Sequence, residues 1–341
     1  MTELLNTLYV QTPGTSLYLE GDSLRVVLPE GGERRTLPLR RLQEIVAFGN
    51  IQFSSALLTR CADDGRPVVW MSSTGRFLSR LDGPTRGNVL LRHAQHLAHA
   101  SPDTSLEVAR AVLAGKFQNS RQLLLRGARD NDRHQDEIRT HADAIADAIP
   151  ALETTRDLDT LRGVEGNAAR HYFTAFALLI RPGLDIAPFP GRRKRPPTDP
   201  TNALLSFLYG LTRSGVHGAA EQVGLDPYIG FLHGLRPGKP ALALDLMEEL
   251  RAPIADRLAL TLLNRRQLRA EHFETLPGGA VQLTEDGRKK TLVEWQDWKK
   301  RDWPHRLLGR RVPAALLPSV QSRILARHLR GELPAYMPWM V

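Results

Sequence analysis

Three separate stretches of the sequence hold side chains that could bind a metal ion or move a proton. The first contains Glu165, which shares one face of an expected helix with Leu161, Ala168 and Tyr172. A carboxylate on an apolar face costs free energy unless something pairs with it, and an alanine one turn on leaves room for a partner. The competing interpretation is an acidic residue near a helix start, stabilised by the helix dipole or by an arginine.

The second stretch is ALALDLMEEL at residues 241–250, which has an apolar face with an acidic pair beside it. Asp245 and Glu248 are three residues apart, so they lie one helical turn apart on that adjoining face. Two like charges at this spacing repel each other, which favours a cation between them. A solvated acidic pair explains the pattern equally well. Glu249 falls closer to the apolar face and suits a structural pairing with an arginine.

The third stretch places His233 between Leu232 and Gly234, shortly before the turn-forming residues 236–240. A lone histidine near a turn is more often structural than catalytic, although the neighbouring glycines let backbone or ligand approach the ring. Two or three carboxylates and one imidazole form a donor set for Mg²⁺ or Mn²⁺ rather than for structural zinc. Such a site can polarise a phosphodiester and stabilise charge on its leaving oxygen.

The elements that must position these residues change character along the chain. Short alternating or clustered apolar runs, separated by turn residues, predict β structure up to about residue 83. A short helix is expected at 54–61. The predicted strands are Thr7–Val10, Ser16–Leu19, Leu24–Leu28, Ile45–Phe48, Pro67–Met71 and Phe77–Leu81.

From Asn88 onward the apolar residues recur at helical spacing, which predicts a larger all-α region. Residues 181–201 interrupt it as a loop rich in proline, after which Asp199 is expected to cap a helix with Pro200 in its first turn. A hairpin is expected around 271–284. We therefore predict an α+β protein with an N-terminal β domain (1–83), a linker and first helix (84–100) and a helical catalytic domain (101–341).

Composition narrows the class of function. The 341 residues carry a formal net charge of +9, which suits a polyanionic partner such as nucleic acid. Cys61 is the only cysteine, which excludes an internal disulfide or a cysteine-rich zinc site and fits a reducing compartment. Neither a signal peptide nor an apolar stretch long enough for a bilayer is evident, so we expect a soluble cytoplasmic protein without a membrane partner.

Two basic or aromatic stretches are candidates for nucleic-acid contact. Arg192, Arg193, Lys194 and Arg195 follow one another in the proline-rich loop, where they could bind phosphates or form a solvated charged run. Three tryptophans interleaved with lysines could stack on bases, although burial in a core or against a partner is at least as good an explanation. These tryptophans are Trp295, Trp298 and Trp303.

Four motifs together carry a family resemblance. They are GVEGNAARHYF at 163–173, PPTDPTNALLS at 196–206, GLDPYIGFLHG at 224–234 and LDLMEELR at 244–251. In this order they resemble the CRISPR-associated endonuclease and integrase of spacer acquisition, the first-numbered family of CRISPR-associated proteins. The resemblance implies a β domain followed by a helical domain, and a metal site at Glu165, His233 and Glu248. It also implies a supporting catalytic role for Asp245. Some members carry Asp at the position of Glu248.

The resemblance further implies what the protein does. A site holding Mg²⁺ or Mn²⁺ would let the 3′-hydroxyl of a foreign DNA fragment attack a phosphodiester of the CRISPR repeat, so that the fragment becomes a new spacer. The implied partners are double-stranded and branched DNA, a second copy of the chain bound through the dimerisation domain 1–83, and a small dimeric ferredoxin-like CRISPR-associated protein. If the chain is of subtype I-C, an iron–sulfur exonuclease is a further partner. Two alternatives stay open: a metal-dependent nuclease of branched DNA in repair, and a basic scaffold that binds nucleic acid without catalysis.

Overall fold

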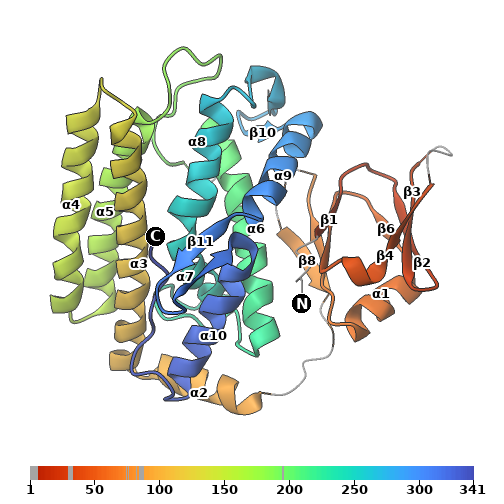
Figure 1. The fold of residues 1–341 in the computed structure, drawn as a ribbon, viewed down its shortest axis with the longest axis horizontal. Helices are drawn as coiled ribbons and strands as arrows, with labels where there is room; N and C mark the ends of the chain where they lie inside the picture. Colours follow the sequence, from red (N-terminus) through yellow and green to blue (C-terminus); the bar gives the residue numbers. More distant parts are fainter. Residues whose placement is uncertain are drawn as a thin grey trace. The chain divides into compact units, whose positions relative to one another are not determined.

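The computed structural model describes residues 7–29, 34–73, 75, 77–81, 83, 88–193 and 196–341. The chain forms two compact units (Figure 1). The first comprises Met1–Gly87 together with Leu283–Lys300, and the second comprises Asn88–Gln282 together with Arg301–Val341. The first unit holds the β-sheets and the second is mostly helical, which confirms the predicted α+β class.

Two four-stranded sheets make up most of the first unit. One has the order β1 (Thr7–Val10), β5 (Glu44–Phe48), β7 (Val68–Met71) and β8 (Phe77–Leu81), with β1, β5 and β7 parallel. The other has the order β4 (Arg34–Pro38), β3 (Ser23–Val27), β2 (Ser16–Glu20) and β6 (Gln52–Phe53). Helix α1 (Ser55–Asp63) and the short 3₁₀ helix η1 (Leu39–Arg41) complete this part. All six predicted strands are present, and the short helix expected at 54–61 is α1.

Strands β4 and β6 were not predicted. The sequence of β4 is RRTLP, which lacks an alternating apolar pattern because the strand lies at a sheet edge and its first three residues are exposed. Strand β6 has only two residues and pairs with β2 in parallel. Apolar side chains from both sheets and from α1 form the core of this unit, including Leu17, Ile45 and Leu57.

Helix α9 (Glu285–Lys299) belongs to the first unit, although residues 283–300 were expected within the helical domain. Its Gln296 amide donates to the Thr7 carbonyl at 2.6 Å, and Lys299 donates to the Thr7 hydroxyl at 3.0 Å. Trp295 is buried. Helical periodicity reports which face of α9 is covered but not which part of the chain covers it, so the sequence could not assign this helix.

Within the described residues, helical segments make up most of the second unit. Helices α3, α4 and α5 lie side by side, with α3 contacting the other two (Figure 1). The segments are α2 (Val89–Ala100), α3 (Pro102–Arg129), α4 (Gln135–Thr154), α5 (Leu158–Leu178), α6 (Pro200–Val223), α7 (Ala241–Leu250), the π-helical turn η2 (Arg251–Asp256), α8 (Arg257–Asn264) and α10 (Leu317–Leu329).

Local sequence signals set several helix starts. Ser101 and Asp157 accept hydrogen bonds from the first turns of α3 and α5, and Asp199 does the same for α6, whose first residue is Pro200. The predicted cap at Asp199 and the predicted proline position are therefore confirmed.

Two short ribbons accompany these helices. The expected hairpin is present as β9 (Phe273–Thr275) and β10 (Val281–Leu283), preceded by η3 (Ala270–His272). A second, unpredicted ribbon pairs β11 (Asp302–His305) with β12 (Arg310–Pro313), before η4 (Ala314–Leu316). The C-terminal region is therefore mostly but not purely helical. Among the described residues, no helix has the length and apolarity needed to cross a bilayer.

Helix α7 is buried along nearly its whole length and packs against α3, α6, η2 and α10. A helix that is apolar on most of its faces is covered on all sides. Its three acidic residues, Asp245, Glu248 and Glu249, are consequently buried as well, and each must find polar or positively charged partners.

Candidate active site

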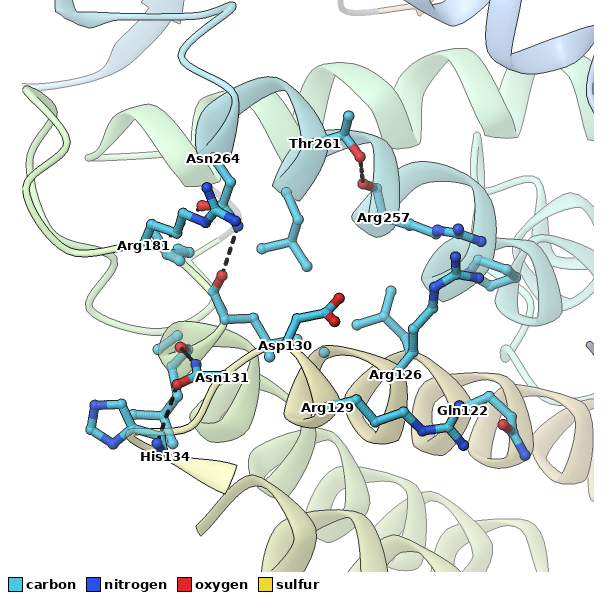
Figure 2. Close-up of a pocket in the computed structure, with 18 of the residues that line it drawn as sticks. Gln122, Arg126, Arg129, Asp130, Asn131, His134, Arg181, Arg257, Thr261 and Asn264 are labelled. Atoms are coloured by element: carbon cyan, nitrogen blue, oxygen red, sulfur yellow. Dashed lines mark hydrogen bonds between the residues drawn. The ribbon is translucent and has the colours of Figure 1, made fainter. Parts of the chain in front are cut away.

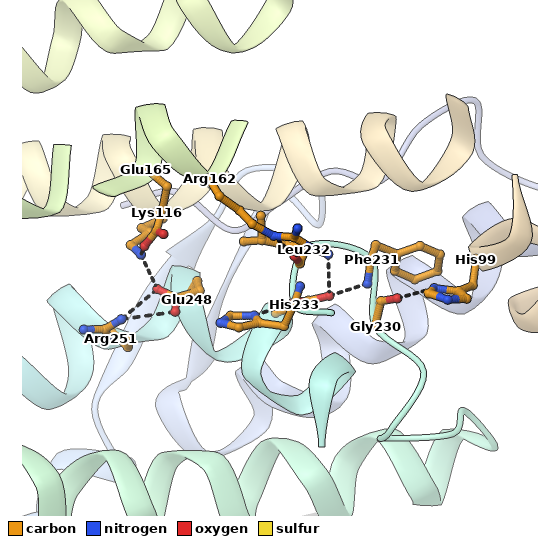
Figure 3. Close-up of polar contacts among 11 residues, drawn as sticks. His99, Lys116, Arg162, Glu165, Gly230, Phe231, Leu232, His233, Glu248 and Arg251 are labelled. Carbon is orange, nitrogen blue, oxygen red and sulfur yellow. Dashed lines mark hydrogen bonds and ion pairs between the residues drawn. The ribbon is translucent and has the colours of Figure 1, made fainter. Parts of the chain in front are cut away.

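Glu165 of α5 and Glu248 of α7 both contact Lys116 of α3 (Figure 3). The Lys116 Nζ lies 2.8 Å from Glu248 Oε2 and makes a close ion pair with Glu165 Oε1. The Glu165 side chain is 30% exposed, whereas those of Glu248 and Lys116 are 6% and 10% exposed. Two of the predicted metal ligands, from distant parts of the sequence, thus converge on one positive charge.

A cavity of about 50 Å³ lies at this convergence. Glu165, Glu248 and Lys116 line it, and Ala168 and Ala169 form part of its wall. The small side chains beside Glu165 leave the room that their place in the sequence indicated. The site is therefore open to a small group rather than packed shut.

Glu248 is ionised despite its burial. Burial alone would raise its pKa, but the positive charges of Arg251 and Lys116 outweigh this and hold the pKa well below its usual range. Arg251 Nη1 donates to both carboxylate oxygens of Glu248, at 3.1 and 2.9 Å. The carboxylate is thus negative and held in place from two directions.

His233 is tied to Asp245 rather than to the other acidic residues. Its Nδ1 lies 2.7 Å from Asp245 Oδ1, and the buried Asp245 carboxylate also accepts the backbone N–H groups of Phe231, Leu232 and His233. A proton on Nδ1 that is donated to the carboxylate leaves the Nε2 lone pair free. Figure 3 shows the ring directed toward Glu248.

Asp245 and Glu248 were expected to share a cation, but in the structure they have different partners. The Asp245 carboxylate hydrogen-bonds residues 231–233 and orients the His233 ring, while Glu248 pairs with Lys116 and Arg251. Three-residue spacing puts both carboxylates near one face, but the loop that wraps over the start of α7 captures the first of them. Glu249 also differs from expectation, because it accepts from Tyr336, Gln321 and the Trp339 backbone rather than from an arginine.

Neighbouring helices fix the loop that carries His233. Arg162, one turn before Glu165 on α5, donates twice to the Leu232 carbonyl, at 3.1 and 2.9 Å. His99 of α2 contacts the Gly230 carbonyl at 2.7 Å (Figure 3). A Cβ at Gly230 would lie 2.6 Å from the Ala241 carbonyl carbon, so this close approach requires glycine.

A buried network of hydrogen bonds supports Arg251. Its Nη2 donates to the Tyr209 hydroxyl at 3.2 Å, and that hydroxyl donates to Asp256 Oδ1 at 2.5 Å. Tyr172 donates to the other Asp256 oxygen at 2.6 Å. Burial raises the pKa of Asp256, although Arg251 opposes this. Arg251 and Asp256 begin and end the π-helical turn η2, a distortion that is frequent at functional sites.

Sequence reasoning missed Lys116, and it left Tyr209 as a core residue. The signal for Lys116 was the one used for Glu165, because Lys116 stands on a buried helical face near Val112, Leu113 and Phe117. A lysine in that place needs an acidic partner. No comparable signal marked Asp256, since its partners come from α5 and α6.

The predicted DNA-binding loop is only partly free for such a role. Arg192 donates to Asn202 Oδ1 at 2.7 Å and to the Ser206 hydroxyl at 3.1 Å, and its guanidinium lies 5.1 Å from the centre of the Tyr209 ring. Burial lowers its pKa. Arg193 is exposed, and Lys194 and Arg195 lie outside the described residues. The tryptophans proposed to stack on bases, Trp295, Trp298 and Trp303, are all buried.

The donor set suits a divalent cation. Two carboxylates and an imidazole with a free Nε2 are hard-metal ligands, and the Lys116 ammonium takes the place of a cation between the carboxylates. Within the described part of the chain, no three His, Cys, Asp or Glu side chains are gathered closely enough to hold a metal as they stand. The side chains of Glu165, Glu248 and His233 therefore fit a divalent cation in their chemical type and direction. The Lys116 ammonium would compete with that cation for the two carboxylates.

Two carboxylates that share a lysine, with an imidazole directed toward them, make up this candidate site in a mostly helical unit. The chain matches the family model described as CRISPR associated protein Cas1 over residues 8–297, and it belongs to that family.

Two curated relatives match almost the whole chain. A CRISPR-associated endonuclease Cas1 of Rhodospirillum rubrum is 47% identical over 348 residues, covering 99% of this chain and 99% of the relative. Another, of Moorella thermoacetica, is 45% identical over 339 residues, covering 99% and 98%. A solved casposase bound to an integration product is 21% identical and shares the fold, with a TM-score of 0.84 over 96% of this chain and 91% of that one.

Proposed function

We propose that this chain inserts DNA fragments as new spacers into a CRISPR array by transesterification. Mg²⁺ or Mn²⁺ would be held by Glu165, His233 and Glu248. The observation that carries the proposal is the convergence of Glu165 and Glu248 on one cation beside an imidazole oriented by Asp245. Membership of the Cas1 family, and relatives named as CRISPR-associated endonucleases, support it.

The reaction exchanges one phosphodiester for another. The 3′-hydroxyl oxygen of the fragment gives up its proton and forms a bond to a phosphorus of the repeat. The bond between that phosphorus and the repeat's own 3′-oxygen breaks. The leaving oxygen takes up a proton, so no covalent bond to the protein forms. When bound, the metal polarises the phosphate and stabilises charge on the departing oxygen.

The chain's own residues orient the participants. Asp245 keeps the proton on Nδ1 of His233, which leaves Nε2 directed into the site. Arg251 fixes the Glu248 carboxylate, and the Lys116 ammonium lies between the two glutamates, where it offsets part of their charge. A bound metal would supply positive charge at the same place. The net charge of +9 favours double-stranded and branched DNA as partners.

A strand-transfer assay on branched DNA with Mn²⁺ tests this function. Glu165→Ala should reduce joining by at least about 100-fold, since one of the three proposed ligands of the metal that polarises the phosphate is lost. Glu153→Ala, at an exposed position on α4, is the matched control and should retain full joining.

The two rival functions predict different products in that assay. A repair nuclease would release the flap by hydrolysis without joining strands. A non-catalytic scaffold would bind the DNA and leave it unchanged. Full strand transfer by the Glu165→Ala protein would overturn the assigned site.

We also propose that the chain acts as a homodimer together with a small dimeric ferredoxin-like CRISPR-associated protein. A chain of similar fold is part of a solved Cas6-RT-Cas1–Cas2 complex, which supports an assembly with a second CRISPR-associated protein. An iron–sulfur exonuclease is a further proposed partner, with subtype I-C as the proposed context. In Geobacter sulfurreducens a Cas4 exonuclease and a Cas1 endonuclease share one chain. That fusion is 34% identical over 335 residues, which cover 96% of this chain and 59% of the fusion. Co-purification followed by mass measurement tests each partner.

A further inference from the structure

Gln95 of α2 is a polar side chain with no exposed surface, and it binds the loop between α6 and α7. Its Nε2 donates to the backbone carbonyls of Asp226 and Ile229, at 2.9 and 2.7 Å. Its Oε1 accepts the backbone N–H of Asp226 at 2.8 Å. All three bonds are thus made to one loop, and that loop carries His233.

This loop, residues 225–240, forms no helix or strand, so its backbone groups need partners from elsewhere. Side chains of α2 and α5 bind several of its carbonyls, and Asp245 of α7 accepts three of its N–H groups. His99 and Arg162, which take part in this, are partly exposed, whereas Gln95 is fully buried. An apolar side chain in place of Gln95 would therefore remove donors that water cannot readily replace.

The peptide unit between Gly230 and Phe231 is held at both ends (Figure 3). Its carbonyl oxygen lies 2.7 Å from His99 Nδ1, and its N–H donates to Asp245 Oδ2 at 2.6 Å. The preceding peptide unit is one whose carbonyl accepts from Gln95. Because a peptide unit is planar, fixing its carbonyl oxygen also fixes the direction of its N–H. The contacts of α2 therefore set how the loop presents N–H groups to Asp245.

The loop lies too close to α7 to shift independently of it. A Cβ at Gly230 would lie 2.7 Å from Asp245 Oδ2 and 2.6 Å from the carbonyl carbon of Ala241. The same Asp245 carboxylate contacts the His233 ring, at 2.7 Å from its Nδ1. In such close packing, a loop that moved would displace the carboxylate and with it the imidazole.

We propose that Gln95 and His99 of α2 are positioning residues for the reaction. Through their bonds to the loop they keep the His233 ring directed toward Glu248, and the effect passes through Asp245. Neither residue contacts the metal or the DNA in this role. The assignment rests on the proposed function, because it takes His233 as a metal ligand. It goes beyond that function by adding α2 to the elements that support the site.

Binding of Mn²⁺ to a Gln95→Met protein tests this role. Methionine is close to glutamine in length and shape but has no N–H to donate. The matched control is Asn264→Leu, because Asn264 likewise binds the backbone of a different segment beside a separate pocket (Figure 2). Its Nδ2 donates to the Leu179 carbonyl at 2.8 Å, and its Oδ1 accepts the Arg181 N–H at 2.9 Å.

In calorimetric titration, Gln95→Met should weaken Mn²⁺ binding by about tenfold, as is usual when a residue that supports a metal ligand is lost. Asn264→Leu should leave the affinity unchanged, even where urea unfolding shows an equal loss of stability. Added to Asp245→Asn, Gln95→Met should weaken binding by less than about twofold more, because both changes act through the His233 ring. A residue with a purely structural role would not show this coupling.

His99→Phe repeats the test at a half-buried position, where the protein should fold even if Gln95→Met does not. Phenylalanine keeps a ring near Phe231, whose centroid lies 6.5 Å from that of the His99 ring, and loses only the bond to Gly230. Mn²⁺ binding should weaken by about threefold, the effect of one partly exposed hydrogen bond, and the loss should again not add to that of Asp245→Asn.

Unchanged Mn²⁺ affinity in a folded Gln95→Met or His99→Phe protein would overturn the role of α2. An equal loss in Asn264→Leu, or full additivity with Asp245→Asn, would do the same. If Glu165→Ala and Asp245→Asn both left the affinity unchanged, the metal site itself would be wrong, and the role of α2 with it. If those two variants weakened binding and the α2 variants did not, only the role of α2 would be wrong.

Discussion

Asp245 holds the imidazole of His233, with Oδ1 2.7 Å from Nδ1, while the same carboxylate accepts three backbone N–H groups of residues 231–233. One buried side chain thus sets both the loop conformation and the proton position on the ring. It acts through His233 and is a positioning residue.

Asp245→Asn should weaken Mn²⁺ binding by about 10- to 100-fold, because an amide cannot accept from all four donors and the ring loses its fixed tautomer. Calorimetric titration measures the affinity, and circular dichroism checks that the variant folds. Asp147→Asn, at an exposed position on α4, serves as the control. Unchanged affinity in a folded Asp245→Asn protein would contradict the role.

Lys116→Met should destabilise the metal-free protein and make it respond more strongly to metal. Without the ammonium, Glu165 loses its ion pair and Glu248 keeps only Arg251, which should lower the free energy of unfolding by about 3 kcal/mol. Added Mn²⁺ should restore that stability, since it then competes with no internal cation.

Thermal unfolding with and without Mn²⁺ measures both effects of Lys116→Met. Lys289→Met, at an exposed position on α9, should behave as the unmodified protein does. If Mn²⁺ raised the unfolding temperature of the unmodified and Lys116→Met proteins equally, Lys116 would not compete with the metal.

Tyr209→Phe should destabilise the protein by about 1–2 kcal/mol, because Asp256 loses one of its two phenolic donors and Arg251 loses an acceptor. Tyr172→Phe should have a similar effect, and the double variant should deviate from additivity because both hydroxyls bind one carboxylate. Urea unfolding of the four proteins gives the coupling. Simple additivity would show that the network does not act as a unit.

Lys299 should make stability depend on pH. Burial, reinforced by the charge of Lys300, lowers its pKa from 10.5 to about 8, while Glu44 opposes the shift. Between these two values the unfolded chain binds more protons than the folded one, so stability should rise as pH increases from 8 toward 10.5. The gain is at most about 3 kcal/mol.

Lys299→Met should remove that rise and should stabilise the protein at neutral pH. Urea unfolding between neutral pH and the upper end of this range measures the difference between the two proteins, with Lys289→Met as the exposed control. A difference that stayed constant with pH would show that the pKa of Lys299 is not lowered.

Much of the secondary structure could be predicted because its signals are local. Alternating apolar residues marked the central strands, and Asp199 with Pro200 marked the start of α6. Strand β4 escaped because an exposed edge strand has no buried face to leave an apolar pattern. The ribbon β11–β12 escaped for a related reason, since each strand has only four residues and β12 begins with two exposed arginines.

The sequence by itself marked Glu165, His233 and Glu248 as polar residues that need an explanation, with a structural role left open for each. Their assignment to one metal site came from the resemblance of four motifs to a known family. Only the tertiary structure decided their partners: Lys116 between the glutamates, and Asp245 on the histidine. Helical periodicity reports that a face is covered, but a hydrogen bond or ion pair depends on which distant element covers it. That choice follows from the packing of α3 against both α5 and the buried helix α7, which no local sequence pattern encodes.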